Sequence, residues 1–263
     1  MLRVLAGYLR SMPLVVRKAK VMHRYSLFMD EATPEQLNKS LRAWRVIKRE
    51  YGYLRSLSEN QCVNAAGEPI PWYTYPAIEQ ISKWDFSDCD ILEYGSGNST
   101  LWWAKHARSV TSIENVPEWH KRVASRLPDN CKLILSPLDE DKEGLEQLKG
   151  YLGTIDDLHS FDVIIIDGVN FPGARYASMG RALSHLKPGG LFIIDNSDWL
   201  PLTCQKMREE GFFEIDFSGL GPLNDSAETT SFFFRKDFRI KPNSNVHPGN
   251  ATGGYPWNKD MIE

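Results

Sequence analysis

The sequence lacks the cysteine patterns and the long hydrophobic runs that mark several classes of protein. Its four cysteines lie far apart and form no C-x-x-C pair: Cys62, Cys89, Cys131 and Cys204. This spacing argues against a zinc site and against a disulfide framework. No run of 18 apolar residues occurs, so we expect no membrane-spanning helix. These absences favour a reducing, cytoplasmic setting.

Acidic residues are absent from residues 1–29, which carry basic side chains alone: Arg3, Arg10, Arg17, Lys18, Lys20 and Arg24. Apolar residues recur there at helical spacing. One interpretation is a basic amphipathic helix in peripheral contact with an anionic membrane surface. The other, which we favour, is a helical extension that packs on its own protein. The net charge of −3 gives no indication of a nucleic-acid partner.

The length of 263 residues suits one main domain with extensions. We assign residues 1–65 to a helical N-terminal extension, 66–241 to the main domain and 242–263 to a C-terminal tail. Within the extension, a helix is predicted over 34–53, because Thr33 can cap it and Pro34 suits its first position. The tail has few apolar residues and is expected to be either disordered or folded as a loop across the domain.

Short apolar segments alternate with helical segments from Asp90 onward. This alternation predicts a doubly wound α/β domain with a mostly parallel sheet. The last two strands should pair antiparallel, because no helical segment joins them. The expected strands are 91–94, 110–114, 132–135, 162–167, 191–195, 212–217 and 231–235. The expected helices are 77–83, 100–107, 119–126, 143–151, 176–185 and 202–210.

The segment DILEYGSGNST, residues 90–100, ends a predicted strand in an acid and a glycine-containing turn. Ligands of open α/β sheets bind beyond the carboxyl ends of the strands. Gly95 permits a tight turn, and Gly97 lets the backbone approach a ligand. Glu93 would repel the pyrophosphate of a dinucleotide, but it suits a ligand with an amino group or a positive charge. Glu114, at the end of the next strand, can accept both hydroxyls of a ribose.

Four segments in order resemble the motifs of class I S-adenosylmethionine-dependent methyltransferases, over about residues 70–238. LEYGSGNST resembles the first motif and SVTSIE the second, while FDVIIIDG and LKPGGLFIID resemble the motifs of the fourth and fifth strands. Ser99 departs from the pattern, because it replaces the third glycine of the first motif. The resemblance implies a seven-stranded Rossmann-like fold and S-adenosylmethionine as cofactor.

The resemblance also implies roles for individual residues. Glu93 would meet the methionine amino group, Glu114 would hold the ribose, and Asn115 would lie beside the adenine. The remaining cofactor-binding residues would be Gly95, Ser96, Gly97, Ser99 and Asp167.

Asp167 ends the predicted fourth strand, and Asp195 and Asn196 end the fifth. Two carboxylates and an amide oxygen suit Mg²⁺ or Ca²⁺. The arrangement is similar to divalent-metal-dependent O-methyltransferases of the catechol and caffeoyl-CoA types, in which the metal lowers the pKa of the substrate hydroxyl. Those enzymes carry a lysine where this chain has Asn170, so either the metal alone suffices or Asp167 is the catalytic base. A purely structural role for the three side chains stays open.

Three further residues are candidates for the substrate site. Arg175 could hold an anionic group or form a structural ion pair. Trp199 could form a wall of the pocket, and Tyr73 could cover the cofactor or substrate or could simply pack. Our hypothesis is an S-adenosylmethionine-dependent methyltransferase that acts on the hydroxyl of a small molecule or a glycan. The alternatives are methylation of a nitrogen or a protein side chain, and a non-catalytic interaction subunit with the same fold.

Overall fold

The computed structural model describes residues 32–169, 171–244 and 249–254. The basic segment 1–29 and its two interpretations therefore lie outside the described residues. The chain divides into two compact units, residues 1–47 and 48–263. Residues 48–65, which the sequence analysis places in the extension, lie in the second unit with the sheet.

Helix α3, Pro34–Arg45, begins as its sequence predicts. The Thr33 side chain accepts a hydrogen bond from the Gln36 amide, and the Gln36 side chain accepts one from the Thr33 amide. This capping box satisfies two N–H groups at the start of the helix. The predicted single helix over 34–53 is wrong in its extent. The α-helix ends at Arg45 and a π-helical turn follows, η1, Val46–Glu50. Gly52 then takes a φ of +79° before α4 begins, which a continuous helix does not allow.

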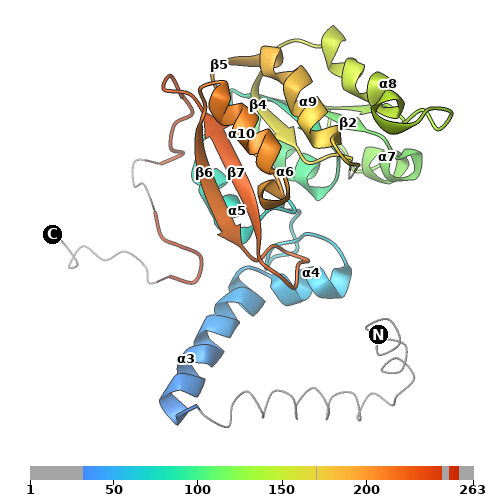
Figure 1. Cartoon of the computed structure of the whole chain (residues 1–263). Coiled ribbons are helices and arrows are strands. Elements are labelled where there is room, and N and C mark those ends of the chain that lie inside the picture. The colour runs from blue at the N-terminus through green and yellow to red at the C-terminus, as the bar shows by residue number, and fades with distance from the viewer. Residues whose placement is uncertain (1–31, 170, 245–248, 255–263) are drawn as a thin grey trace. The chain divides into compact units, whose positions relative to one another are not determined.

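Seven strands form one sheet in the order β3-β2-β1-β4-β5-β7-β6. Figure 1 shows β6 and β7 side by side at one edge of this sheet. The strands are β1 Asp90–Tyr94, β2 Ser109–Glu114, β3 Cys131–Leu135, β4 Phe161–Ile166, β5 Leu186–Ile194, β6 Phe213–Gly219 and β7 Glu228–Phe234. The first five are parallel, and β7 pairs antiparallel with both β5 and β6. The predicted α/β fold and the antiparallel last pair are confirmed.

Helices cover both faces of the sheet. The α-helices after residue 52 are α4 Tyr53–Glu59, α5 Tyr75–Ile81, α6 Asn98–His106, α7 Pro117–Ala124, α8 Lys149–Gly153, α9 Ala174–Ala182 and α10 Pro201–Glu209. On one face, α8, α9 and α10 bury a core around Leu92, Ile164 and Phe192. On the other face, aromatic contacts join Trp84 to Phe232 and Phe86 to Trp103. The predicted helix 143–151 is instead a 3₁₀ turn, η2 Gly144–Leu148, followed by the short α8.

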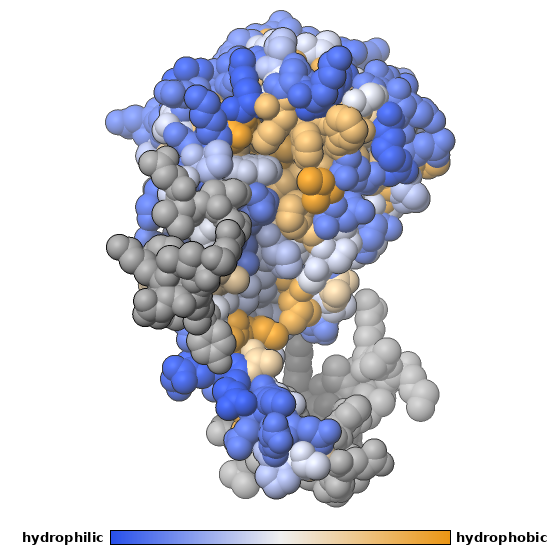
Figure 2. All heavy atoms as spheres, turned by 90° about the vertical axis from the view of Figure 1, so that its left-hand side faces the viewer, coloured by the Kyte–Doolittle hydropathy of each residue, from blue (hydrophilic) through white to orange (hydrophobic). Residues whose placement is uncertain are grey.

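The edge strand β6 leaves apolar side chains in contact with solvent. Phe213 and Ile215 are about half exposed. Figure 2, which views the side of the domain that carries β6, shows an apolar patch in an otherwise mostly hydrophilic surface. Among the helices of the described ranges, none is both long and apolar enough to cross a membrane.

The described residues of the C-terminal tail run along α5. The Asn243 amide donates to the Lys83 carbonyl over 3.0 Å, and the Asn243 side-chain amide donates to the Ser82 carbonyl over 2.7 Å. The Thr252 amide donates to the Glu79 carboxylate. These parts of the tail are therefore folded against the domain, as one of the two expectations for this segment had it.

Candidate active site

A cavity of about 340 Å³ opens beyond the carboxyl ends of β1 and β4. Its walls come from the turn after β1, the residue that follows β4, helix α7 and the residues just after it, the segment around Cys62, Trp72, and the loop between β6 and β7. The lining includes Asn60, Cys62, Trp72, Ser96, Gly97, Asn98, Ser99, Trp119, Arg126, Asp167 and Leu223. The cavity lies where ligands of open α/β sheets bind. Four of the predicted cofactor residues line it: Ser96, Gly97, Ser99 and Asp167.

The turn after β1 is held close to the end of β4. Gly95 has a φ of +103°, and a Cβ at this position would lie 3.2 Å from the carbonyl oxygen of Asp167. The left-handed φ strains any residue with a side chain, and the tight contact adds to that cost, so both favour glycine. Gly97 has an extended φ of 164°, and a Cβ there would approach only the Trp119 ring and the Ser99 hydroxyl, at 3.8 and 4.0 Å. Gly95 is thus needed for the fold of the turn, whereas Gly97 keeps the surface of the cavity free of a side chain.

Glu93 is a buried carboxylate with one unpartnered oxygen. Its Oε2 accepts hydrogen bonds from Thr100 Oγ1 at 2.5 Å and Ser112 Oγ at 3.0 Å. Within the described part of the chain, its Oε1 has no hydrogen-bond partner. Burial raises the pKa of Glu93 to about 7, and the negative charge of Asp167 adds to this, against the opposing effect of the neighbouring hydroxyls. A buried oxygen without a donor is costly, so it suits a ligand that brings a donor such as an ammonium group.

Glu114 ends β2 beside the same turn. Its Oε2 accepts from the Ser96 hydroxyl at 2.7 Å, and its Oε1 accepts from the Val116 amide at 2.8 Å. A carboxylate oxygen can accept more than one hydrogen bond, so Glu114 retains acceptor capacity for a ribose. Asn115 follows it directly and is half-buried. The Trp119 indole donates to the Ser96 carbonyl at 2.7 Å, which fixes α7 over the turn.

Two segments distant in sequence cover this cavity. The Asn98 side chain donates to the Cys62 carbonyl at 2.7 Å, which ties the segment after α4 to the turn. The Trp72 indole donates to the Asn224 side chain, and the Tyr53 hydroxyl donates to the Asn224 carbonyl at 2.7 Å. Burial, together with the charges of Asp167 and Asp195, raises the pKa of the Cys62 thiol to about 12. The Cys62 thiol is therefore uncharged at neutral pH, and it lines the cavity without acting as a nucleophile.

A guanidinium group occupies the rim between the ends of β4 and β5. Arg175 donates to the carbonyl oxygens of Gly168 at 3.1 Å and Asp195 at 2.6 Å. It also donates to Asn196 Oδ1 at 3.0 Å and Asp167 Oδ1 at 3.4 Å. Its side chain is largely buried. Arg175 thus holds together the three residues that the sequence analysis assigns to a metal.

The carboxyl groups at this rim have raised pKa values. Burial raises the pKa of Asp167 to about 6; the charge of Arg175 opposes this shift, and that of Glu228 adds to it. Burial and the neighbouring Asp167 raise the pKa of Asp195 well above its usual range. The Thr230 hydroxyl donates to Asp195 Oδ1 at 2.6 Å, and the Asn196 amide donates to Glu228 at 2.7 Å. The rim therefore has an excess of negative charge that favours a cationic ligand.

The predicted metal ligands do not form an open oxygen site. Among the described residues, no group of three or more His, Cys, Asp or Glu side chains is placed to hold a metal ion. Asp167 and Asn196 direct oxygens to Arg175, and one oxygen of Asp195 is used by Thr230. The arrangement as it stands fits a guanidinium and does not fit Mg²⁺ or Ca²⁺, which need several free oxygen ligands.

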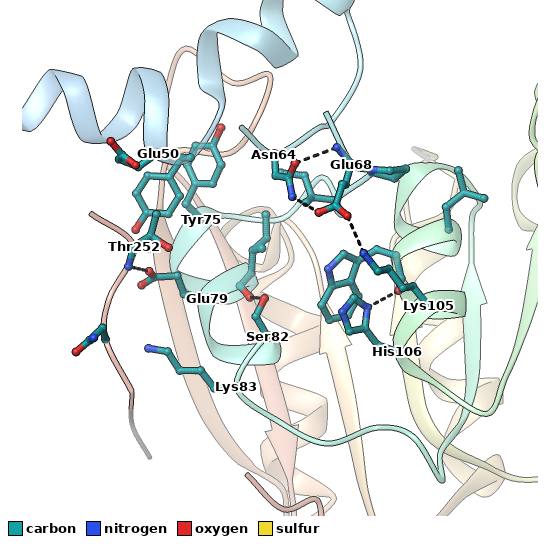
Figure 3. A pocket seen from close by; sticks show the side chains of 17 residues that line it. Glu50, Asn64, Glu68, Tyr75, Glu79, Ser82, Lys83, Lys105, His106 and Thr252 are labelled. Atoms are coloured by element: carbon teal, nitrogen blue, oxygen red, sulfur yellow. Dashed lines mark hydrogen bonds and ion pairs between the residues drawn. The ribbon is translucent and has the colours of Figure 1, made fainter. Parts of the chain in front are cut away.

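Two further cavities flank the domain. One of about 780 Å³ lies on the other side of Arg175 and is lined mainly by apolar residues, Trp199 among them. The other, of about 570 Å³, is shown in Figure 3. Its charged residues are largely engaged with neighbours, as Lys105 is with Glu68 at 2.8 Å, and none of the predicted site residues lines it.

Some residues of the site carry no signal in the sequence that marks them. Trp119, Cys62 and Leu223 line the cavity beyond β1 and β4, and no sequence motif contains them. The contact of Ser112 with Glu93 could be predicted once β1 and β2 are aligned as parallel strands, because the two residues lie opposite each other. Tyr73 is fully buried, and its hydroxyl accepts from the Trp103 indole at 3.4 Å. Its neighbour Trp72 supplies the aromatic wall.

Comparison with known proteins agrees with the motifs. A family model described as "Methyltransferase domain" matches residues 92–197. No curated protein sequence matches the chain.

Solved structures with a similar fold include three that span most of their own chains. One is a protein assigned as an O-methyltransferase from Klebsiella pneumoniae, with 19% identity, 56% of this chain and 72% of that chain covered, and a TM-score of 0.45. The second is precorrin-6y C5,15-methyltransferase from Geobacter metallireducens GS-15, with 12% identity, coverage of 61% and 87%, and a TM-score of 0.46.

The third is the N-methyltransferase NodS from Bradyrhizobium japonicum WM9 in complex with S-adenosyl-L-homocysteine, with 12% identity, coverage of 78% and 90%, and a TM-score of 0.41. The motifs, the strand order and the family match agree, and residues 92–197 are identified as a class I S-adenosylmethionine-dependent methyltransferase domain.

Proposed function

We propose that the chain methylates the hydroxyl group of a small molecule and that it does so without a metal ion. One observation carries the proposal. Asp167 lines the cofactor cavity and contacts Arg175, which lines the adjacent apolar cavity. Asp167, which titrates near neutral pH, and the cation Arg175 are therefore in contact between the two cavities. One cavity can hold the cofactor and the other an acceptor.

The residues divide the work as follows. S-adenosylmethionine supplies a methyl group on a positively charged sulfur. Glu93 accepts a hydrogen bond from the ammonium group, and Glu114 accepts from the ribose. Buried carboxylates around the cavity favour the cationic cofactor over its neutral product.

Asp167 acts as the general base. With a pKa of about 6 it is ionised at pH 7 and can still accept a proton. The acceptor oxygen forms the new C–O bond while the C–S bond breaks, the sulfur retains that electron pair, and the hydroxyl proton passes to Asp167. Arg175 orients Asp167 and stabilises the developing negative charge on the oxygen. In this role it takes the place of the metal predicted at Asp167, Asp195 and Asn196.

The test is transfer of labelled methyl groups from S-adenosylmethionine to matched hydroxyl and amine acceptors. We expect Asp167→Asn to lower transfer to the hydroxyl acceptor by about 100-fold or more, as loss of a general base does. The control is Asp129→Asn, at an exposed aspartate outside the site, which should leave the rate unchanged. Wild-type rates in Asp167→Asn, or transfer to amines alone, would contradict the proposal.

A further inference from the structure

The cavity beyond Arg175 is large and has a polar inner end. It has a volume of about 780 Å³, within the range of small-molecule sites. Its walls are mainly apolar and include Leu145, Phe171, Tyr176, Trp199, Leu200 and Leu202. Arg175 and Asn196 supply polar side chains where it meets the rim of the sheet. The polarity of the cavity thus changes from one end to the other.

Several of these apolar side chains face solvent. Trp199 is 61% exposed and Leu202 is 70% exposed. Both follow Asn196, in the short turn η5 Ser197–Trp199 and at the start of α10. A cluster of exposed apolar side chains around a cavity marks a surface whose burial by a ligand is favourable, because it lowers the free energy. Its place directly beside the rim indicates that the acceptor covers it.

We infer that this cavity is the acceptor site and that its substrate class is an uncharged, largely apolar alcohol with an aromatic or alicyclic body. The inference rests on the proposed function and narrows its acceptor from any small-molecule hydroxyl. The body of the acceptor lies against Trp199, Tyr176 and Leu202, and its hydroxyl lies at Arg175, next to Asp167. The edge and face of the Trp199 ring suit contact with another ring.

A sugar does not fit this chemistry. It would bring several hydroxyl groups to walls that are mainly apolar, and each hydroxyl buried without a partner costs free energy. An anionic acceptor is disfavoured for a different reason. Arg175 already forms an ion pair with Asp167, and the carboxylate of Glu228 accepts a hydrogen bond from Asn196. The rim therefore has no excess positive charge. One uncharged hydroxyl on an apolar body meets both conditions.

The test measures binding of 2-naphthol, an aromatic alcohol, by calorimetry to the full chain, with D-glucose as the polar probe. Each titration is run with and without saturating S-adenosylhomocysteine. We expect 2-naphthol to bind and glucose not to bind. Trp199→Ala and Leu202→Gln should each weaken 2-naphthol binding at least fivefold, while the affinity for S-adenosylhomocysteine changes less than twofold. Both residues are largely exposed, so these variants should fold.

Phe213→Ala is the matched control, because Phe213 is similarly exposed on β6 and does not line the cavity. Equal 2-naphthol affinity in Trp199→Ala and Phe213→Ala would overturn the inference, as would binding of glucose in preference to 2-naphthol. Failure of S-adenosylhomocysteine to bind the wild type would instead count against the proposed function. The titrations without S-adenosylhomocysteine still decide the acceptor class in that case.

Discussion

The most informative single residue is Glu93, whose charge depends on pH in the range where proteins are usually assayed. Its pKa of about 7 in the empty protein means that part of it is protonated at neutral pH. An ammonium ligand needs the ionised form, so binding of S-adenosylmethionine must release a proton. We expect the affinity to weaken as pH falls below about 7.

Calorimetry in two buffers with different heats of ionisation checks this expectation. Proton release should be measurable at pH 6.5 and should fade at pH 8. In Glu93→Gln, proton release should be much smaller. Release that is equal in the variant and the wild type would assign the proton to another group, of which Asp167 is the first candidate.

Arg175 is the residue that separates a metal-free reaction from the metal-dependent type. Because it occupies the rim at Asp167 and Asn196, we expect removal of divalent ions with EDTA to change methyl transfer less than twofold. Arg175→Gln should lower the rate by about 10-fold or more, through loss of a positive charge at the developing anion. A rate that EDTA abolishes and Mg²⁺ restores would instead support the ligand set Asp167, Asp195 and Asn196.

At the scale of elements, the turn between β1 and α6 contains two glycines, Gly95 and Gly97, whose substitution should have different effects. Gly95→Ala meets both a left-handed φ and a close contact with the Asp167 carbonyl, so it should destabilise the protein by about 1–3 kcal/mol. Gly97→Ala faces neither a left-handed φ nor a close contact with the backbone. Its new methyl group enters the cavity beyond β1 and β4. It should keep its stability and lose affinity for S-adenosylmethionine.

Thermal unfolding and calorimetric titration of the two variants separate these effects. Gly95→Ala should unfold several degrees below the wild type, and Gly97→Ala should unfold close to it. An unchanged melting temperature in Gly95→Ala would show that the turn tolerates a side chain. Unchanged affinity in Gly97→Ala would place the cofactor elsewhere.

The elements that a local pattern defines were predictable, and those that depend on distant contacts were not. The carboxyl ends of β1, β2, β4 and β5 agree with the sequence prediction within one residue, because an apolar strand and the polar residue that ends it are adjacent in the sequence. The start of β5 lies at Leu186, five residues before the predicted start at 191. The predicted helix 34–53 ends early, at Arg45, and the chain beyond it is set by a distant contact, because the Gly52 backbone lies against that of Asn64. The position of Arg175 also depends on distant contacts, since its partners Gly168 and Asn196 follow two different strands, β4 and β5.

At the scale of the whole molecule, the buried carboxyl groups of the site should make the free energy of unfolding depend on pH. The pKa of Glu93 rises from 4.5 to about 7 on folding, and those of Asp167 and Asp195 rise as well. A carboxyl group with a raised pKa in the folded state binds protons more tightly there, so stability falls as pH rises from about 4.5 to about 7. For Glu93 alone the loss is on the order of 3 kcal/mol.

Thermal unfolding of the empty protein between pH 5 and pH 7.5 tests this sign. The melting temperature should fall across the window, and saturating S-adenosylmethionine should reduce the fall by binding the ionised form. Asp90 and Asp162 carry lowered pKa values, so their contribution is lost only below about pH 4 and does not mask the effect. A melting temperature that rises with pH in the empty protein would contradict the buried, strained state of these carboxyl groups.

The central claim is that S-adenosylmethionine binds at the turn after β1 through the free oxygen of Glu93. The most direct measurement is calorimetric titration of S-adenosylmethionine into the wild type, Glu93→Gln and the control Asp129→Asn at pH 8. We predict binding to the wild type and the control, and an affinity at least 10-fold lower in Glu93→Gln, as expected for a lost charge-assisted hydrogen bond. Equal affinity in all three proteins, or no binding to any of them, would contradict the account.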